Sequence, residues 1–316
     1  MTSRVLLSLL LATAVGCETA PSKLDSIVKA APTAATARES APGVASLVEG
    51  DHSGDTEARL RRLENDYAKH AEALDFLAKV YGQQKAQEEQ QASQEHDPAA
   101  MFAVEIAADI KLGKVDGPAT APVTIVKAFD FACPYCQRTS AIMDELVAEY
   151  QGKVRVVYKD LVVHPDVAMD AHLAACASSL QGKYKAYKNV LWEKGFNAYA
   201  AARDPSKLAK ANLVAIAAEA GVDGAKLATD MAGDQCKQLV AADMAELQKF
   251  KVSGTPAFFI NGKFIGGALP KEGFKQVIDE QLKIAAASGV PGAEYYDKVV
   301  LAKGEKAFRS IADAKR

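Results

Sequence analysis

Two cysteines stand at the point where a run of apolar residues gives way to a helical pattern, in the stretch Cys133-Pro134-Tyr135-Cys136. The run over 123–126 has the pattern of a buried strand. After the cysteines, Ile142 and Leu146 share one face of a helix predicted to end at about Tyr150. This order predicts an α/β domain with the cysteines at a turn between strand and helix.

The chemistry of this turn follows from its place at the start of a helix. Pro134 suits the first helical turn, because its missing N–H would have no partner there. The free N–H groups and the positive end of the helix dipole stabilise an anion, so Cys133 should lose its proton easily. Cys136 is close enough to resolve a mixed disulfide, and Pro134 with Tyr135 tunes how readily the pair is reduced. We expect a redox pair that needs no organic cofactor and no metal.

Two other uses of a paired cysteine motif are weaker. A zinc site needs four ligands, usually two such pairs or one pair with spaced histidines. Cys176 and Cys236 stand alone, and His164 and His172 offer no matching spacing. A purely structural disulfide is the other alternative, but closing a loop of so few residues stabilises a fold little.

The elements that follow the cysteines predict the rest of the domain. Asn-Gly between two apolar runs is a strong hairpin signal, and it occurs here at Asn261-Gly262. A strand-helix-strand unit followed by a hairpin and helix is a thioredoxin-type layout, here with a helical insertion. The predicted elements are an edge strand over 101–110, a strand over 153–159, an insertion at about 167–250, strands over 257–260 and 263–265, and a helix from 271 to about 287.

A second motif, Gly254-Thr255-Pro256, directly precedes the hairpin. With the stretches 130–136 and 254–262 and the insertion between them, residues 99–287 resemble the DsbA-like family of thioredoxin-fold disulfide oxidoreductases. Pro256 comes 120 positions after Cys136, far more than a bare thioredoxin domain needs. The resemblance implies a cis Thr255–Pro256 bond against the redox pair, and a Thr255 backbone that pairs with an extended substrate strand.

One position departs from the family pattern. Six residues before the first cysteine the family often carries a buried acid, which assists proton transfer at the second cysteine. Lys127 stands there in this chain, and the nearest acid is Asp130. A nearby ammonium would favour a thiolate, whereas an outward-facing lysine would have no role. The departure leaves the route of the proton open.

The N-terminus predicts export from the cytoplasm. Arg4 precedes an apolar run over 5–15 that is too short to span a bilayer and is typical of a signal sequence. The stretch 11–17 resembles a bacterial lipobox ending at Cys17, although Ala14 stands where leucine is more frequent. A plain secretory signal is the alternative to lipidation of Cys17. Both place the chain in the periplasm or cell envelope, where disulfides persist.

The remaining cysteines, Cys176 and Cys236, both fall in the helical insertion. In an oxidising compartment such an even remainder predicts a structural disulfide. Two separate buried cysteines, which pack as small apolar groups, are the alternative.

The chain therefore divides into five segments. Residues 1–17 form the signal with its lipobox, 18–55 a flexible linker with few large apolar groups, 56–96 a helix, 97–287 the DsbA-like domain, and 288–316 a polar tail with one more helix. In the helix over 56–96, apolar or weakly apolar residues recur at 3–4 spacing: Leu60, Leu63, Tyr67, His70, Leu74, Leu77 and Tyr81. This spacing predicts a coiled coil that makes a homo-oligomer; a solvated helix, or one packed on its own domain, is the alternative.

These features together predict an enzyme. With 38 basic and 40 acidic residues, the chain has no positive excess that would indicate nucleic acid binding. We expect a thiol–disulfide oxidoreductase, oxidase or isomerase, that acts on cysteine-containing envelope proteins and exchanges electrons with a membrane redox partner. A lipid-anchored adaptor that uses the thioredoxin fold for binding without turnover is the alternative.

Overall fold

A computed structural model describes residues 53–314 of the chain. The predicted signal, the lipobox with Cys17 and most of the predicted linker lie outside the described residues. The chain divides into two compact units, Met1–Tyr81 and Gly82–Arg316, and each is described by itself. Helix α3 (Thr56–Gln94) begins in the first unit and ends in the second.

The second unit is built on a five-stranded sheet with the order β1-β3-β2-β4-β5. The central strands β2 and β3 run parallel, and the other pairs are antiparallel. At the hairpin turn Asn261 and Gly262 have φ of 46° and 85°, the left-handed region that such turns require. The strands are β1 (Val115–Asp116), β2 (Val123–Phe129), β3 (Val154–Asp160), β4 (Ala257–Ile260) and β5 (Lys263–Gly266).

The two faces of the sheet are covered by different parts of the chain. Side chains alternate along a strand, so Ile125 and Phe129 of β2 join one core cluster, and Val126 and Ala128 join the other. The first cluster includes residues of α5 (Pro134–Glu149) and α12 (Lys271–Ala287). These two helices lie together, and Lys275 of α12 donates to Glu149 of α5 at 2.6 Å. This arrangement is the thioredoxin-like fold predicted from the sequence.

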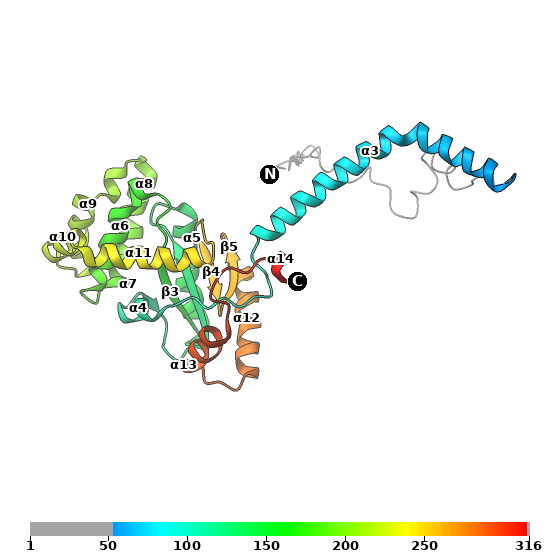
Figure 1. The fold of residues 1–316 in the computed structure, drawn as a ribbon. Helices are drawn as coiled ribbons and strands as arrows, with labels where there is room; N and C mark the ends of the chain where they lie inside the picture. Colours follow the sequence, from blue (N-terminus) through cyan, green and yellow to red (C-terminus); the bar gives the residue numbers. More distant parts are fainter. Residues whose placement is uncertain (1–52, 315–316) are drawn as a thin grey trace, which may run out of the picture. The chain divides into compact units, whose positions relative to one another are not determined.

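The helical insertion lies between β3 and β4 and forms the green and yellow helices at one side of the sheet (Figure 1). Gly221, at φ 66°, ends one of its helices, and Asp223 caps the next by accepting from the Lys226 N–H. A disulfide between Cys176 and Cys236 joins its first and last helices. The elements are α6 (Pro165–Ser179), α7 (Tyr184–Val190), η1 (Leu191–Phe196), α8 (Asn197–Ala202), η2 (Pro205–Leu208), α9 (Lys210–Ala215), η3 (Ala217–Ala220), α10 (Gly224–Ala232) and α11 (Asp234–Lys249).

Two predicted segments are wrong. The stretch 101–110 forms no edge strand: 102–104 are all buried, and the chain continues into the short helix α4 (Ala107–Lys111). The alternation of residue types that suggested an edge strand occurs here in a segment that is covered from both sides. The C-terminal segment is not a polar tail either, because Tyr295, Tyr296 and Val300 join the second core cluster. It contains three short helices instead of one: α13 (Gly292–Tyr295), η4 (Tyr296–Leu301) and α14 (Ile311–Ala314).

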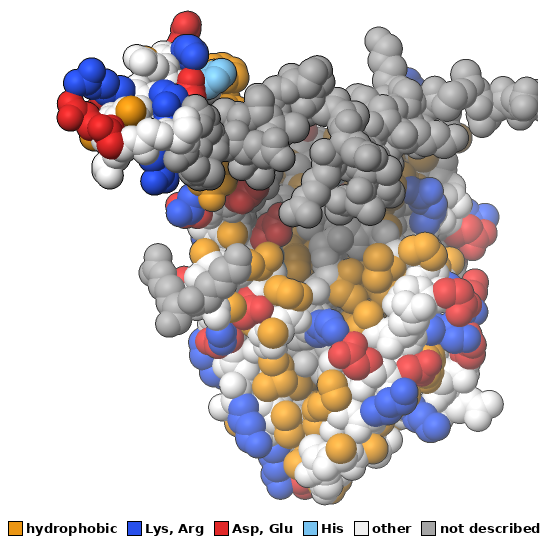
Figure 2. All heavy atoms as spheres, turned by 90° about the vertical axis from the view of Figure 1, so that its right-hand side faces the viewer, with side chains coloured by type: hydrophobic (Ala, Val, Ile, Leu, Met, Phe, Trp, Pro, Cys, Tyr) orange, Lys and Arg blue, Asp and Glu red, His pale blue; other side chains and the backbone are white. Residues whose placement is uncertain are grey.

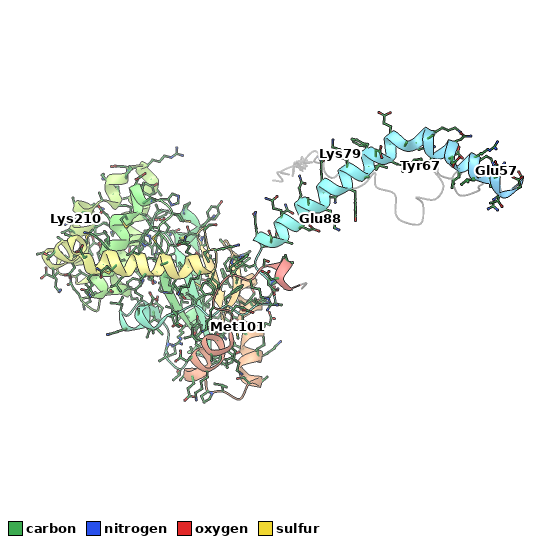
Figure 3. All side chains as sticks on the ribbon, viewed as in Figure 1. Glu57, Tyr67, Lys79, Glu88, Met101 and Lys210 are labelled. Atoms are coloured by element: carbon green, nitrogen blue, oxygen red, sulfur yellow. A yellow bond between two sulfur atoms is a disulfide. The ribbon has the colours of Figure 1, made fainter. Side chains whose placement is uncertain are left out.

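Helix α3 lies within the predicted range 56–96, and its start is capped: the Ala58 N–H donates to Asp55 Oδ1 at 2.9 Å. No described residue of α3 is buried. Its apolar side chains are exposed, Leu63 by 69% and Leu77 by 60%. Figure 3 shows Glu57, Tyr67, Lys79 and Glu88 along the helix.

The described surface carries charges of both signs. On the face shown in Figure 2, Lys and Arg side chains are interspersed with Asp and Glu. That face therefore lacks the continuous basic surface that is typical of nucleic acid binding.

Candidate active site

The Cys-Pro-Tyr-Cys motif lies where β2 is followed by α5. Cys133 is the N-cap of α5, with extended backbone at φ −88° and ψ 118°, and Pro134 occupies the first turn. The Cys136 and Gln137 N–H groups donate to the Cys133 carbonyl oxygen at 3.1 and 3.2 Å. Both thiols are free: Cys133 is 5% exposed and Cys136 is fully buried. The motif thus places one sulfur at the surface edge and the other inside.

The two sulfurs differ in acidity. Hydrogen bonding from the Cys136 side chain, followed by the Thr255 side chain and the backbone N–H groups of Cys136 and Tyr135, lowers the pKa of Cys133 to about 5. Burial, and then the hydrogen bond to Cys133, raises the pKa of Cys136 far above its usual range. At neutral pH the pair is therefore a Cys133 thiolate, which can attack, beside a protonated Cys136 thiol.

The second motif meets the first across 122 positions of sequence. Cys133 Sγ lies 3.4 Å from the Thr255 carbonyl oxygen, and the Thr255–Pro256 bond is cis. The sequence-predicted residues Cys133, Cys136, Thr255 and Pro256 thus come together at one place.

Tyr135 and Pro134 line the outside of the pair. The Tyr135 side chain is 53% exposed, and the Arg138 guanidinium lies 4.5 Å from the centre of its ring. Beside Pro134 lies a groove of about 350 Å³, whose other walls include Phe196, Tyr199 and Arg203 of the insertion. This apolar groove, with one cationic side chain, adjoins the motif that holds Cys133.

Lys127 lies in the interior beneath the pair, so the alternative of an outward-facing residue is wrong. It is fully buried, and its Nζ donates to the Cys136 carbonyl oxygen at 3.0 Å and to Ser140 Oγ at 2.8 Å. Burial lowers the pKa of Lys127 to about 7. An amine that titrates near neutrality therefore lies next to the backbone of the resolving cysteine.

Asp130, the acid nearest to the pair in sequence, shapes the loop that leads into it. Its Oδ1 accepts from the Ala132 N–H at 2.7 Å, and its Oδ2 accepts from the Val163 and His164 N–H groups at 2.7 and 2.8 Å. The Asp130 N–H donates to Cys136 Sγ at 3.5 Å. One carboxylate therefore ties the loop before Cys133 to the loop after β3.

His172 is a supporting residue that the sequence did not reveal. Its Nε2 accepts from the Phe131 N–H at 3.3 Å, and its Nδ1 lies 2.7 Å from Asp160 Oδ1. Since Nε2 accepts a hydrogen bond, the ring proton is on Nδ1, and this N–H donates a hydrogen bond to Asp160 Oδ1. The only sequence signal is a single histidine in a helix, 41 positions after Phe131, so local spacing gives no hint of the contact.

Behind Asp160 lies a buried network of lysines and aspartates. Lys114 Nζ donates to Asp160 Oδ2 at 2.9 Å, and Lys159 Nζ donates to Asp109 at 2.7 Å and Asp243 at 2.8 Å. These charges come from the β1 end of the sheet, β3, α4 and α11. The network fixes the end of β3 and, through Asp160 and His172, the loop before Cys133.

Comparisons with known proteins bear on the family and the fold. A family model described as thioredoxin matches residues 111–280. A 34% identical stretch of 152 residues in the Na(+)/H(+) antiporter NhaA 3 of Salinispora tropica covers 47% of this chain and 22% of that protein. The "Probable disulfide bond formation protein D" of Bacillus cereus is 28% identical over 54% of this chain and 78% of its own. The crystal structure of oxidised BdbD from Bacillus subtilis has a TM-score of 0.50 at 20% identity, over 59% of this chain and 100% of that one.

The lengths covered limit how much of these relatives is similar to this chain. The chain spans 22% and 28% of the length of the first two antiporters that it matches, so the likeness concerns one segment of those proteins. Among residues 53–314 no helix has the length and apolar character that crossing a bilayer requires. The likeness to BdbD concerns the fold.

Proposed function

This chain belongs to the thioredoxin family, with a DsbA-like fold, and we propose that it is a thiol–disulfide oxidoreductase acting on cysteine-containing proteins of the bacterial cell envelope. The observation that carries the proposal is the opposed acidity of two adjacent sulfurs. Cys133 is held as a thiolate at the N-cap of α5, and Cys136 keeps its proton in the interior. Such a pair divides attack and resolution between its two members.

The reaction balances without any cofactor. In the oxidising direction a substrate thiolate attacks Cys133 Sγ of the Cys133–Cys136 disulfide, which forms a mixed disulfide and releases Cys136. A second substrate thiolate then attacks the substrate sulfur, closing the substrate disulfide and releasing the Cys133 thiolate. Two electrons pass from the substrate to the pair, and a membrane redox partner would take them on. The same steps in reverse reduce a disulfide.

Two features beside Cys133 would contact a substrate. The Thr255 backbone, 3.4 Å from Cys133 Sγ at its carbonyl oxygen, would pair with an extended substrate segment. The groove beside Pro134 would take an apolar side chain of that segment. Main-chain pairing tolerates many sequences, which suits an enzyme with many clients.

We place the protein at the membrane surface of the envelope on its N-terminal sequence. Arg4, the apolar run over 5–15 and the lipobox-like end at Cys17 support a lipid anchor, and 18–55 would hold the domain away from the bilayer. The disulfide between Cys176 and Cys236 fits an oxidising compartment.

Isomerisation is a second candidate role, and the exposed stripe of α3 favours it. Its residues Leu60, Leu63, Leu74 and Leu77 keep heptad spacing and are exposed, so a second copy of α3 would cover them as a coiled coil. Several redox pairs around one misfolded substrate make the second contact effectively intramolecular. Such an assembly suits shuffling wrong disulfides. An adaptor without turnover is disfavoured, because binding alone does not need both an intact redox pair and Thr255-Pro256.

The test compares two single substitutions. Cys133→Ala should abolish insulin reduction and dithiol oxidation, whereas Cys136→Ala should accumulate mixed disulfides with client proteins on non-reducing gels. Full activity of Cys133→Ala would remove the catalytic assignment and leave the adaptor as the better explanation.

A further inference from the structure

Lys127 differs from the other buried lysines of the domain. Lys114, Lys159 and Lys188 each reach a buried aspartate within 3.0 Å. Lys127 is equally buried, yet its Nζ contacts only neutral acceptors, the Cys136 carbonyl and the Ser140 hydroxyl. Among residues 53–314, no carboxylate lies within ion-pairing distance of it. The interior thus contains one lysine without a permanent counter-charge, and it lies beneath the redox pair.

The charge of such an amine depends on what else is charged nearby. Burying an ammonium without a partner is costly, so Lys127 favours its neutral form when the site is neutral. The charged or titratable groups that face it are Cys133 at the N-cap of α5, Cys136 and Asp144 of α5, and Lys188 of α7. Burial dominates the lowered pKa of Lys127, while the two cysteines and Asp144 raise it and Lys188 lowers it. Only the cysteines change charge during the reaction.

On the basis of the proposed function, we propose that Lys127 takes up a proton when the Cys133–Cys136 disulfide is reduced, and that this makes the pair a stronger oxidant. Reduction breaks the S–S bond and adds two electrons from a substrate dithiol. The substrate releases two protons; one goes to Cys136 Sγ and the other to Lys127 Nζ, while Cys133 remains a thiolate. Oxidation of the pair releases both protons again.

The charge pair exists in the reduced form only, and this gives the reaction its direction. A thiolate and an ammonium attract each other strongly in a site shielded from water. The oxidised form has no thiolate and gains nothing, so the attraction favours reduction of the pair and donation of its disulfide. A buried carboxylate at position 127 would repel the thiolate and act in the opposite sense. The preferred substrates are therefore reduced proteins with free thiols.

The experiment measures the equilibrium of the pair with glutathione from pH 5 to 9, in the full chain with Cys17→Ser. The equilibrium constant for reduction is first corrected for the protons of glutathione. If the protein takes up two protons on reduction, this constant falls about a hundredfold per pH unit. If it takes up one proton, the constant falls about tenfold per pH unit. The wild type should show the steeper dependence between about pH 5 and 7, the values to which Cys133 and Lys127 are shifted, and the shallower one above. Lys127→Met should show the shallower dependence throughout.

At pH 6 the equilibrium constant of Lys127→Met should be lower by about tenfold, which is about 30 mV for a two-electron couple. Ser140→Ala is the matched control, because it removes the hydroxyl partner and keeps the amine; it should retain the two-proton dependence. Equal pH dependence in wild type and Lys127→Met would overturn the proposal.

A measurement on the unsubstituted Lys127 covers the case in which Lys127→Met does not fold. The ¹⁵N resonance of Lys127 Nζ should titrate near pH 7 in the reduced protein and at lower pH in the oxidised protein. The same midpoint in both forms would refute the proposed proton uptake. If no reversible Cys133–Cys136 disulfide forms against glutathione, the proposed function fails; if it forms but these two readouts do not differ, only the role of Lys127 fails.

Discussion

The acidity of Cys133 should depend on Cys136. Hydrogen bonding from the Cys136 side chain is the largest cause of the lowered pKa of Cys133, ahead of Thr255 and the backbone N–H groups. A hydrogen bond to a charged group contributes about 1.5–3 kcal/mol, and one pKa unit corresponds to about 1.4 kcal/mol. Cys136→Ala should therefore raise the pKa of Cys133 from about 5 by roughly one to two units.

The assay follows thiolate absorbance near 240 nm and the rate of alkylation of Cys133 against pH, with Cys17→Ser in every variant. Cys136→Ser is the matched control: its hydroxyl can still donate, so its midpoint should lie below that of Cys136→Ala. An unchanged midpoint in Cys136→Ala would show that the helix N-terminus alone sets the acidity of Cys133. A midpoint near that of an ordinary thiol in the wild type would refute the assignment of Cys133 as the nucleophile.

Three other predictions test the remaining parts of the chain. Cys17→Ser should move the protein from the membrane fraction to the soluble periplasm, and unchanged fractionation would exclude the lipid anchor. Replacing Cys176 and Cys236 by alanine should lower the free energy of unfolding by about 4 kcal/mol, because their disulfide spans 60 residues. Urea denaturation measures this free energy, and a loss below about 1 kcal/mol would contradict the prediction. The double substitution Leu63→Glu and Leu77→Glu should convert the oligomer into a monomer, as measured by light scattering, and should reduce isomerisation of scrambled ribonuclease. Lys79→Glu, which lies outside the apolar stripe, should change neither property. A monomeric wild type would exclude the coiled coil.

The sequence predicted the elements whose signals are local. The start of α5 follows from Pro134 at the first helical turn, and the hairpin follows from Asn261-Gly262, which adopt the left-handed backbone that this turn needs. The approach of Thr255 to Cys133 is implied by the resemblance to the DsbA-like family, because neither motif alone places residues that are 122 positions apart. Local propensity and a known motif pair therefore define most of the catalytic turn.

The wrongly predicted edge strand over 101–110 and the open orientation of Lys127 share a physical cause, which is burial from two sides. Strand β2 is buried at all seven positions, so its sequence has no polar face against which an inward lysine would stand out. The segment 102–104 is likewise buried and passes beneath the C-terminal residues, where the Ala103 N–H donates to the Glu305 carbonyl oxygen at 2.8 Å. A period of two or of 3.6 reveals an element only when one side of it meets water. Neither segment meets that condition.

Asp130 and Lys127, two ionisable residues that precede Cys133, differ in what their hydrogen bonds require. Asp130 is nearer in sequence, but its two oxygens already accept three backbone N–H groups, from Ala132, Val163 and His164. These contacts hold the loop before the nucleophile, so the Asp130 carboxylate already has a structural use. Lys127 has no such commitment, because a neutral amine and an ammonium can both donate to the Cys136 carbonyl and to Ser140. A proton can therefore arrive at Lys127 and leave it while its hydrogen bonds, and the helix that carries the cysteines, stay in place.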